Sequence, residues 1–121
     1  MPSRFYQLAI DCHDPRLLTR FWAAALGQQV LAEDDEEVIV GAGTHSYPGL
    51  CFVAVPEGKT IKNRLHIDLD PDDRDAEVDR LLALGATRAD VGQGPEATWV
   101  VLADPEGNEF CVLRPHRSLI E

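Results

Sequence analysis

The sequence predicts an α+β fold in which two βαβββ modules, about residues 4–56 and 63–115, form one domain over residues 1–121. One observation is the stretch 64–69, where apolar and polar residues alternate as in a strand with one apolar face. Another is an amphipathic helical pattern that occurs once in each half. The order of strand, helix and three strands is repeated, and neither module alone would bury its apolar sheet face well.

The first module is expected to begin with a strand at residues 4–11 and a helix after it. Asp14 suits the N-cap of that helix, and Pro15 suits its first position. The helix carries one apolar stripe, formed by Leu17, Leu18, Phe21, Trp22 and Ala25. Gly27 follows as a residue that can adopt the left-handed conformation of a helix C-terminus. The boundaries therefore predict a helix over 15–26, with Trp22 as a packing residue.

Three strands complete the first module, at residues 28–32, 37–41 and 50–55. The acidic run between Glu33 and Glu37 is expected to be a solvated turn, and residues 43–49 a loop. The polar connection 57–62, which contains Gly58, divides the halves.

The second module repeats this order from the strand around His66. Residues 70–73 (Asp-Pro-Asp-Asp) predict the start of a helix, which should bury Ala76, Val78, Leu81 and Leu82 and end at Gly85. Strands are expected at 87–91, 98–103 and 109–113, with a tight turn at 104–108 and a tail at 114–121.

Composition limits the classes of partner. The chain is 45% hydrophobic and 26% charged, as in a soluble domain, and its formal net charge is −10. Nucleic acid and anionic membranes are therefore not expected as partners, because both require Lys and Arg to meet phosphate. No apolar run reaches the roughly 18 residues of a membrane span, and no signal peptide is evident. Together these features predict a cytoplasmic protein.

Cysteine usage agrees with a reducing compartment. Cys12, Cys51 and Cys111 are odd in number, far apart, and form no CxxC pair. A disulfide framework or a structural zinc site is not expected. Cys51 and Cys111 lie in apolar strands and are interpreted as small buried residues.

Three motifs carry a family resemblance: DPRLLTRFWAAALG in the first half, RLHIDL at the start of the second, and LADPEGNEFCVL at its end. Over roughly residues 4–115 the chain resembles the vicinal oxygen chelate superfamily, which includes glyoxalase I, bleomycin-resistance proteins, extradiol dioxygenases and methylmalonyl-CoA epimerase. The resemblance implies a cup-shaped mixed sheet with the helices outside and the site inside. It specifies activity much less than fold, because this one fold serves many reactions.

Metal-dependent members hold their ion with residues on the first and last strands of each module. Carried over, these positions are Gln7, His66, Cys111 and about Phe52. Gln and His both occur as ligands in such members, but Phe52 can donate nothing. A Gln-His-Cys set suits a soft ion such as zinc, yet it lacks the carboxylate that such enzymes use as a base. We therefore expect no usual metal centre; a divalent metal, if bound, would use Gln7 and His66.

His66 admits three interpretations. It can be a structural residue hydrogen-bonded to Asp68, Gln7 or the backbone. It can contact a ligand, or act as a catalytic acid or base, because its ordinary pKa of about 6.5 lies near neutral pH. Asp68 and Asp11 occupy matching positions, where aspartates usually face water or cap loops.

Aromatic residues offer a wall for a planar ligand. Trp99, Phe52 and Tyr47 are the candidates, although strand aromatics more often belong to the core, which is the preferred interpretation of Phe52. No phosphate-binding glycine pattern and no Ser-His-Asp arrangement is evident in the sequence.

Two hypotheses result. In the first, a homodimeric cup binds a small organic ligand, such as an aromatic metabolite or an antibiotic, without metal. The residues lining it would be Gln7, Phe52, His66, Trp99 and Cys111. In the second, the protein is a metal-dependent lyase, isomerase or dioxygenase. Its ion would be held by Gln7 and His66, with Glu57 or Glu109 as a further donor.

Overall fold

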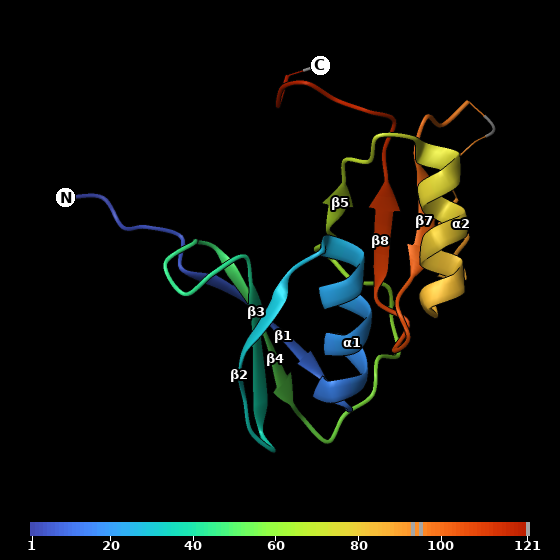
Figure 1. Cartoon of the computed structure of the whole chain (residues 1–121). Coiled ribbons are helices and arrows are strands. Elements are labelled where there is room, and N and C mark those ends of the chain that lie inside the picture. Colours follow the sequence, from blue (N-terminus) through green and yellow to red (C-terminus); the bar gives the residue numbers. More distant parts are fainter. Residues whose placement is uncertain (93, 95, 121) are drawn as a thin grey trace. The chain divides into compact units, whose positions relative to one another are not determined.

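The computed structural model describes residues 1–92, 94 and 96–120. The chain forms two compact units, Met1–Lys59 and Thr60–Glu121. Each unit contains a strand, a helix and three further strands in that order (Figure 1). The predicted α+β class and the repeated βαβββ order are confirmed. Neither helix in the described residues has the length and apolar character needed to cross a membrane.

The first unit is a four-stranded mixed sheet with one helix. Its elements are β1 (Gln7–Cys12), α1 (Pro15–Leu26), β2 (Gln29–Glu33), β3 (Glu37–Gly41) and β4 (Gly49–Ala54). The strand order is β1-β4-β3-β2. Strand β1 runs parallel to β4, and the other neighbours are antiparallel. The first and last strands of the unit therefore lie side by side.

Helix α1 has the boundaries that its sequence predicts. Asp14 is the N-cap, and its Oδ1 accepts a hydrogen bond from the Leu17 N–H at 3.2 Å. Gly27 ends the helix at φ 63°, a left-handed conformation that glycine adopts without strain. The stripe packs against β3 and β4, and the fully or almost fully buried side chains of this core are Leu18, Phe21, Trp22, Val38, Val40 and Phe52.

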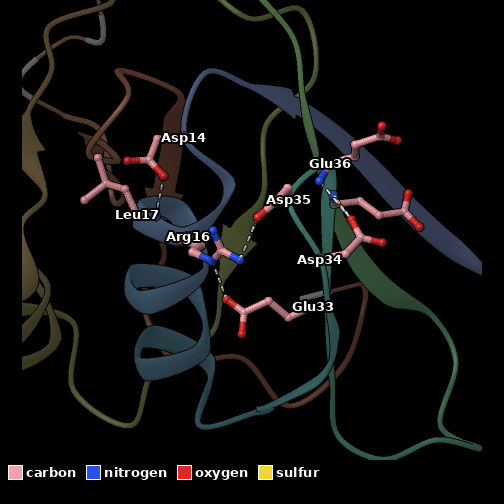
Figure 2. Close-up of polar contacts among 8 residues, drawn as sticks. Asp14, Arg16, Leu17, Glu33, Asp34, Asp35 and Glu36 are labelled. Atoms are coloured by element: carbon pink, nitrogen blue, oxygen red, sulfur yellow. Dashed lines mark hydrogen bonds and ion pairs between the residues drawn. The ribbon is translucent and has the colours of Figure 1, made fainter.

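The acidic turn is tied to the helix by one arginine (Figure 2). Arg16 donates to Glu33 at 2.8 Å and to Asp35 at 3.3 Å. Within the turn, Asp34 Oδ1 accepts from the backbone N–H groups of Glu36 and Glu37, which lowers the pKa of that carboxyl. All these groups are exposed, so the contacts order the turn more than they stabilise the fold.

The second unit repeats the topology with shorter strands. Its elements are β5 (Asp68–Leu69), α2 (Arg74–Leu84), β6 (Thr87–Arg88), β7 (Val100–Ala103) and β8 (Glu109–Val112). The strand order β5-β8-β7-β6 matches that of the first sheet, with β5 parallel to β8. The predicted tail has no regular structure in its described part, and Glu121 lies outside the described residues.

Helix α2 starts later than the Asp70-Pro71 pair indicates, because Asp73 is the N-cap and accepts from the Ala76 N–H at 3.1 Å. Gly85 ends the helix at φ 123°. Val78 and Leu81 are buried as predicted. Ala76 is exposed, so its predicted inward position is wrong. It lies in the first turn, beyond the end of the apolar stripe.

The strand expected across 64–69 is also shorter than predicted. Only Asp68 and Leu69 pair with β8, and the Leu65 side chain is 77% exposed. The reason is the partner strand. Asp68 pairs with Cys111, so in the same parallel register Arg64 would meet Gly107, which belongs to the turn before β8. Arg64 and Leu65 therefore have no strand residue to pair with, because β8 begins only at Glu109.

Candidate functional site

A cavity of about 470 Å³ lies on the second unit. This volume is in the range of about 300–1,000 Å³ that is common for small-molecule sites. Part of its wall is apolar, formed by Val91, Trp99, Val101 and Leu113. The other part is polar, formed by Lys62, His66, Asp68, Glu109 and the thiol of Cys111. An apolar wall with a few converging polar groups is the usual composition of a ligand pocket.

Two neighbouring strands position the polar wall. Asp68 on β5 pairs with Cys111 on β8, and the Cys111 N–H donates to the Ile67 carbonyl at 2.9 Å. His66 precedes Asp68 by two residues, and its Nδ1 lies 3.0 Å from Asp68 Oδ1. The sulfur of Cys111 lies 3.8 Å from the same nitrogen. The three side chains therefore meet at one point of the wall.

The hydrogen bond to Asp68 assigns roles to the two nitrogens of His66. A carboxylate oxygen accepts, so Nδ1 carries the proton in this contact. In a neutral imidazole, Nε2 is then an acceptor. The His66 and Asp68 side chains are 43% and 47% exposed. A ligand in the cavity can therefore reach the ring.

Cys111 is the buried member of this group, with 7% of its surface exposed. Burial, with the negative charge and hydrogen bond of Asp68, raises the pKa of its thiol to about 11. Near neutral pH the sulfur is therefore a protonated thiol. It is a weak hydrogen-bonding group rather than a thiolate nucleophile.

The segment that leads to His66 is held by hydrogen bonds to Glu109, the first residue of β8, and to Asn108 just before it. Both carboxylate oxygens of Glu109 accept from the Asn63 N–H, at 3.2 and 3.3 Å. The Asn63 side chain donates to Asn108 Oδ1 at 3.0 Å. Glu109, which the sequence offers as a further metal donor, is thus already hydrogen-bonded to the backbone.

The remaining predicted site residues are divided between this cavity and the first unit. Trp99 is 40% exposed at the cavity, whereas Gln7 lies on β1 and Tyr47 before β4, both in the first unit. Phe52 is completely buried in the first core. The expectation that Phe52 lines the ligand site is therefore corrected, because a completely buried ring cannot contact a ligand. The burial agrees with the preferred interpretation of Phe52 as a packing residue.

The strand registers also correct the position that was assigned to Phe52. Ala9 pairs with Cys51 on β4, as Asp68 pairs with Cys111 on β8. Gln7 and His66 each lie two residues earlier. Cys51, one position before Phe52, is therefore the counterpart of Cys111. Its sulfur lies 3.6 Å from Glu37 Oε2, and burial raises the pKa of its thiol.

Asp68 is the site residue that sequence reasoning undervalued. The i, i+2 spacing placed it on the face of His66, but nothing in the sequence placed it beside Cys111. That contact depends on the register of two strands whose paired residues, Asp68 and Cys111, are 43 positions apart in the sequence. The cavity residues Lys62, Val101 and Leu113 were missed for the same reason.

The four family metal positions, with Cys51 in place of Phe52, supply an amide, an imidazole and two thiols. A hard divalent ion prefers carboxylate and carbonyl oxygens, so this set does not fit such an ion. The sequence also predicts that Gln7 and His66 would hold a metal ion together. Because these residues belong to different units, neither unit by itself tests the pair, and it stays a prediction.

Comparison with protein families matches residues 7–113 to the Glyoxalase-like domain. The match covers most of the chain, from β1 to the residue after β8. A search of curated protein sequences finds no significant relative.

Several solved structures share the fold. A glyoxalase/bleomycin resistance protein/dioxygenase family enzyme from Burkholderia phytofirmans PsJN is 22% identical with a TM-score of 0.70, covering 94% of this chain and 100% of that chain. TnmS3, an antibiotic binding protein from a Streptomyces species, is 20% identical with a TM-score of 0.65, covering 95% and 98%. Lactoylglutathione lyase from Agrobacterium tumefaciens is 19% identical with a TM-score of 0.62, covering 93% and 94%. At such identities the likeness establishes the fold and no activity.

Proposed function

The chain belongs to the glyoxalase-like domain family, and from this membership and the cavity on its second unit we propose that it binds a small organic molecule there. The observation that carries the proposal is the pairing of an exposed Trp99 wall with the His66 imidazole in one cavity of ligand size. The fold is compatible with binding alone, since one structural neighbour is an antibiotic binding protein.

The chemistry of the wall suggests the class of ligand. A planar or aromatic part would lie against Trp99, where ring contacts contribute about 0.5–1.5 kcal/mol beyond burial. A hydroxyl or N–H group of the ligand would donate to Nε2 of His66, because Nδ1 already faces Asp68. An aromatic metabolite or an antibiotic with a phenol or amide group meets both requirements. Contacts from Gln7 remain part of the prediction.

The experiment is a thermal-shift screen of aromatic small molecules, followed by calorimetric titration of each hit. Trp99→Ala should weaken binding about tenfold, the upper end of the ring contribution. Tyr47→Ala is the matched control, because Tyr47 is equally exposed at 40% but lies outside the cavity residues. Equal loss of affinity in both variants, or none in Trp99→Ala, would contradict the assignment of the cavity.

His66 is tested separately with His66→Ala. The proposal expects weaker ligand binding with an unchanged unfolding midpoint, because the side chain is nearly half exposed. Unfolding of this variant under conditions where the parent is folded would instead make His66 a structural residue.

The alternative function is a metal-dependent lyase, isomerase or dioxygenase. The imidazole, carboxylate and thiol that converge in the cavity favour it, because they are metal-ligating types. Turnover of a vicinal oxygen substrate that requires added metal and is lost in His66→Ala would support this alternative. Ligand binding that is indifferent to chelators, with no turnover, would support the binding protein.

Homodimer formation and a cytoplasmic location are further parts of the proposal. The dimer is suggested by the family resemblance. Sedimentation that shows only a monomer at micromolar concentration would refute the proposal of a dimer. The location is suggested by three buried cysteine thiols in a chain without a disulfide pattern. Fractionation of the native cells tests it.

A further inference from the structure

Arg74, the first residue of α2, makes a contact that reaches the aromatic wall of the cavity. Its Nη1 donates to the Thr98 carbonyl at 2.8 Å, across 24 residues of sequence. Thr98 directly precedes Trp99, which lines the cavity. We propose that Arg74 is a positioning residue that holds Trp99 in place for the planar part of a ligand. The inference rests on the proposed binding of a small organic molecule and adds the group that orders its aromatic wall.

The planarity of the peptide bond carries this contact to the ring. The Thr98 carbonyl and the Trp99 N–H belong to one planar unit with little freedom of rotation. A donor that fixes the carbonyl therefore fixes the plane from which the Trp99 Cα departs. On its other side Trp99 is followed by Val100, where β7 begins to pair with β8. The backbone of Trp99 is thus held between a strand and a hydrogen bond from a helix.

The Arg74 guanidinium is itself oriented for this donation. Asp75 Oδ1 accepts from its Nε at 3.1 Å and lies 3.1 Å from its Nη2. These two nitrogens form one edge of the rigid planar group, so Nη1 remains for the Thr98 carbonyl. The Arg74 side chain is 32% exposed and that of Asp75 is 81% exposed. The ion pair therefore orients the guanidinium more than it stabilises the fold.

Helix stability does not account for an arginine at this position. The first turn of a helix carries the positive end of the helix dipole, so a cation there is unfavourable. The other charged residues of this turn, Asp75 and Glu77, have the favourable sign. Arg74→Ala is accordingly a mild change for α2, because it removes that cation and introduces the best helix former.

Fluorine NMR tests the role of Arg74 without a ligand. The full chain is labelled with 5-fluorotryptophan, and because it contains two tryptophans, Trp99→Phe assigns both resonances. Arg74→Ala should shift or broaden the Trp99 resonance. The Trp22 resonance, from a ring buried in the first unit, should stay unchanged and serves as the internal reference. An unchanged Trp99 resonance in Arg74→Ala would overturn the proposal.

Two further variants separate the hydrogen bond from a general effect on α2. Arg80→Ala removes another arginine of the same helix, which pairs with Glu77, and should leave the Trp99 resonance at the parent position. Arg74→Lys keeps a charged donor on a long side chain and should restore part of the parent position. Equal shifts in Arg74→Ala and Arg80→Ala, or a larger shift in Arg74→Lys than in Arg74→Ala, would also overturn the proposal.

Calorimetric titration with 2-naphthol, a planar molecule with one hydroxyl donor, measures the consequence for binding. Arg74→Ala should weaken binding about three- to tenfold, because the ligand must then order the Trp99 side chain. In the Trp99→Ala background the same substitution should cause no further loss, since the ring that Arg74 positions is gone. Equal losses in the two backgrounds would contradict a positioning role.

The spectra and the titration separate this inference from the proposed function. A parent protein that binds no 2-naphthol would count against the proposed function, while the fluorine spectra still decide whether Arg74 positions Trp99. If 2-naphthol binds in a Trp99-dependent way, and neither the Trp99 resonance nor the affinity responds to Arg74→Ala, the positioning role alone is refuted.

Discussion

Asp104 offers the sharpest test of how the turn before β8 supports the site. The residue is 3% exposed, and its Oδ1 accepts from the backbone N–H groups of Glu106 and Asn108, at 2.9 and 3.0 Å. Both carboxylate oxygens also accept from the Asn108 side-chain amide. Asn108 in turn accepts from Asn63, in the segment that leads to His66. Asp104→Ala should therefore loosen the turn and the approach to the site together.

The expected loss can be worked out from these contacts. A hydrogen bond to a charged group contributes about 1.5–3 kcal/mol, but Glu106 and Asn108 are half-buried, so water can replace part of what is lost. We expect Asp104→Ala to lower the free energy of unfolding by about 2–4 kcal/mol. Asp104→Asn keeps an oxygen for the two backbone N–H groups and places its own amide against Asn108. It should lose about half as much.

Urea unfolding measures both variants, provided that the slope of free energy against urea is unchanged. Three outcomes would refute the reasoning. They are a loss below about 1 kcal/mol in Asp104→Ala, a larger loss in Asp104→Asn than in Asp104→Ala, or a changed slope. The first would mean that water serves the two N–H groups as well as the carboxylate does.

Three further outcomes follow from burial and charge. Thr19→Val should leave stability unchanged or raise it by up to about 1 kcal/mol in urea unfolding, because Thr19 Oγ1 is buried with no hydrogen-bond partner among the described residues. Phe52→Ala should lower the free energy of unfolding by about 3–5 kcal/mol, since the ring is completely buried; a folded variant with normal stability would restore a ligand-contacting role. For Cys111 the raised pKa means that the folded state keeps its proton when the unfolded state has lost it. Relative to Cys111→Ser, the parent should thus lose stability as pH rises from about 9 to about 11, measured as urea midpoints across that interval.

Local rules predicted the helices well because their ends are chemically marked. Asp14, Asp73, Gly27 and Gly85 each satisfy a helix terminus with their own side chain or backbone conformation, independent of the rest of the chain. The apolar stripe of α1 likewise specifies its buried face without knowledge of the sheet. These features could be predicted from neighbours in sequence alone.

The limits of β5 and the composition of the site depend on the register in which β5 pairs with β8. This register could not be predicted from the sequence. Alternation extends from Arg64, but in the observed register Arg64 and Leu65 face residues 107 and 108, which precede β8. For the same reason, an alignment shifted by one residue placed Phe52 where Cys51 belongs. A shift of one residue moves a side chain to the opposite face of a strand, so the error exchanged a core phenylalanine for a thiol.

Register also explains how two modules of one topology come to differ in chemistry. Both bring a cysteine on the last strand beside a residue of the first strand, through the same parallel pairing. The backbone therefore fixes where the two side chains meet, and the residue types alone decide what they can do. Ala9 offers Cys51 no polar group, whereas Asp68 gives Cys111 a carboxylate and orients the His66 ring through Nδ1. Different residues at two positions thus suffice to give the second unit an imidazole and a carboxylate beside the thiol, which the first unit lacks at the matching positions, with no change of fold.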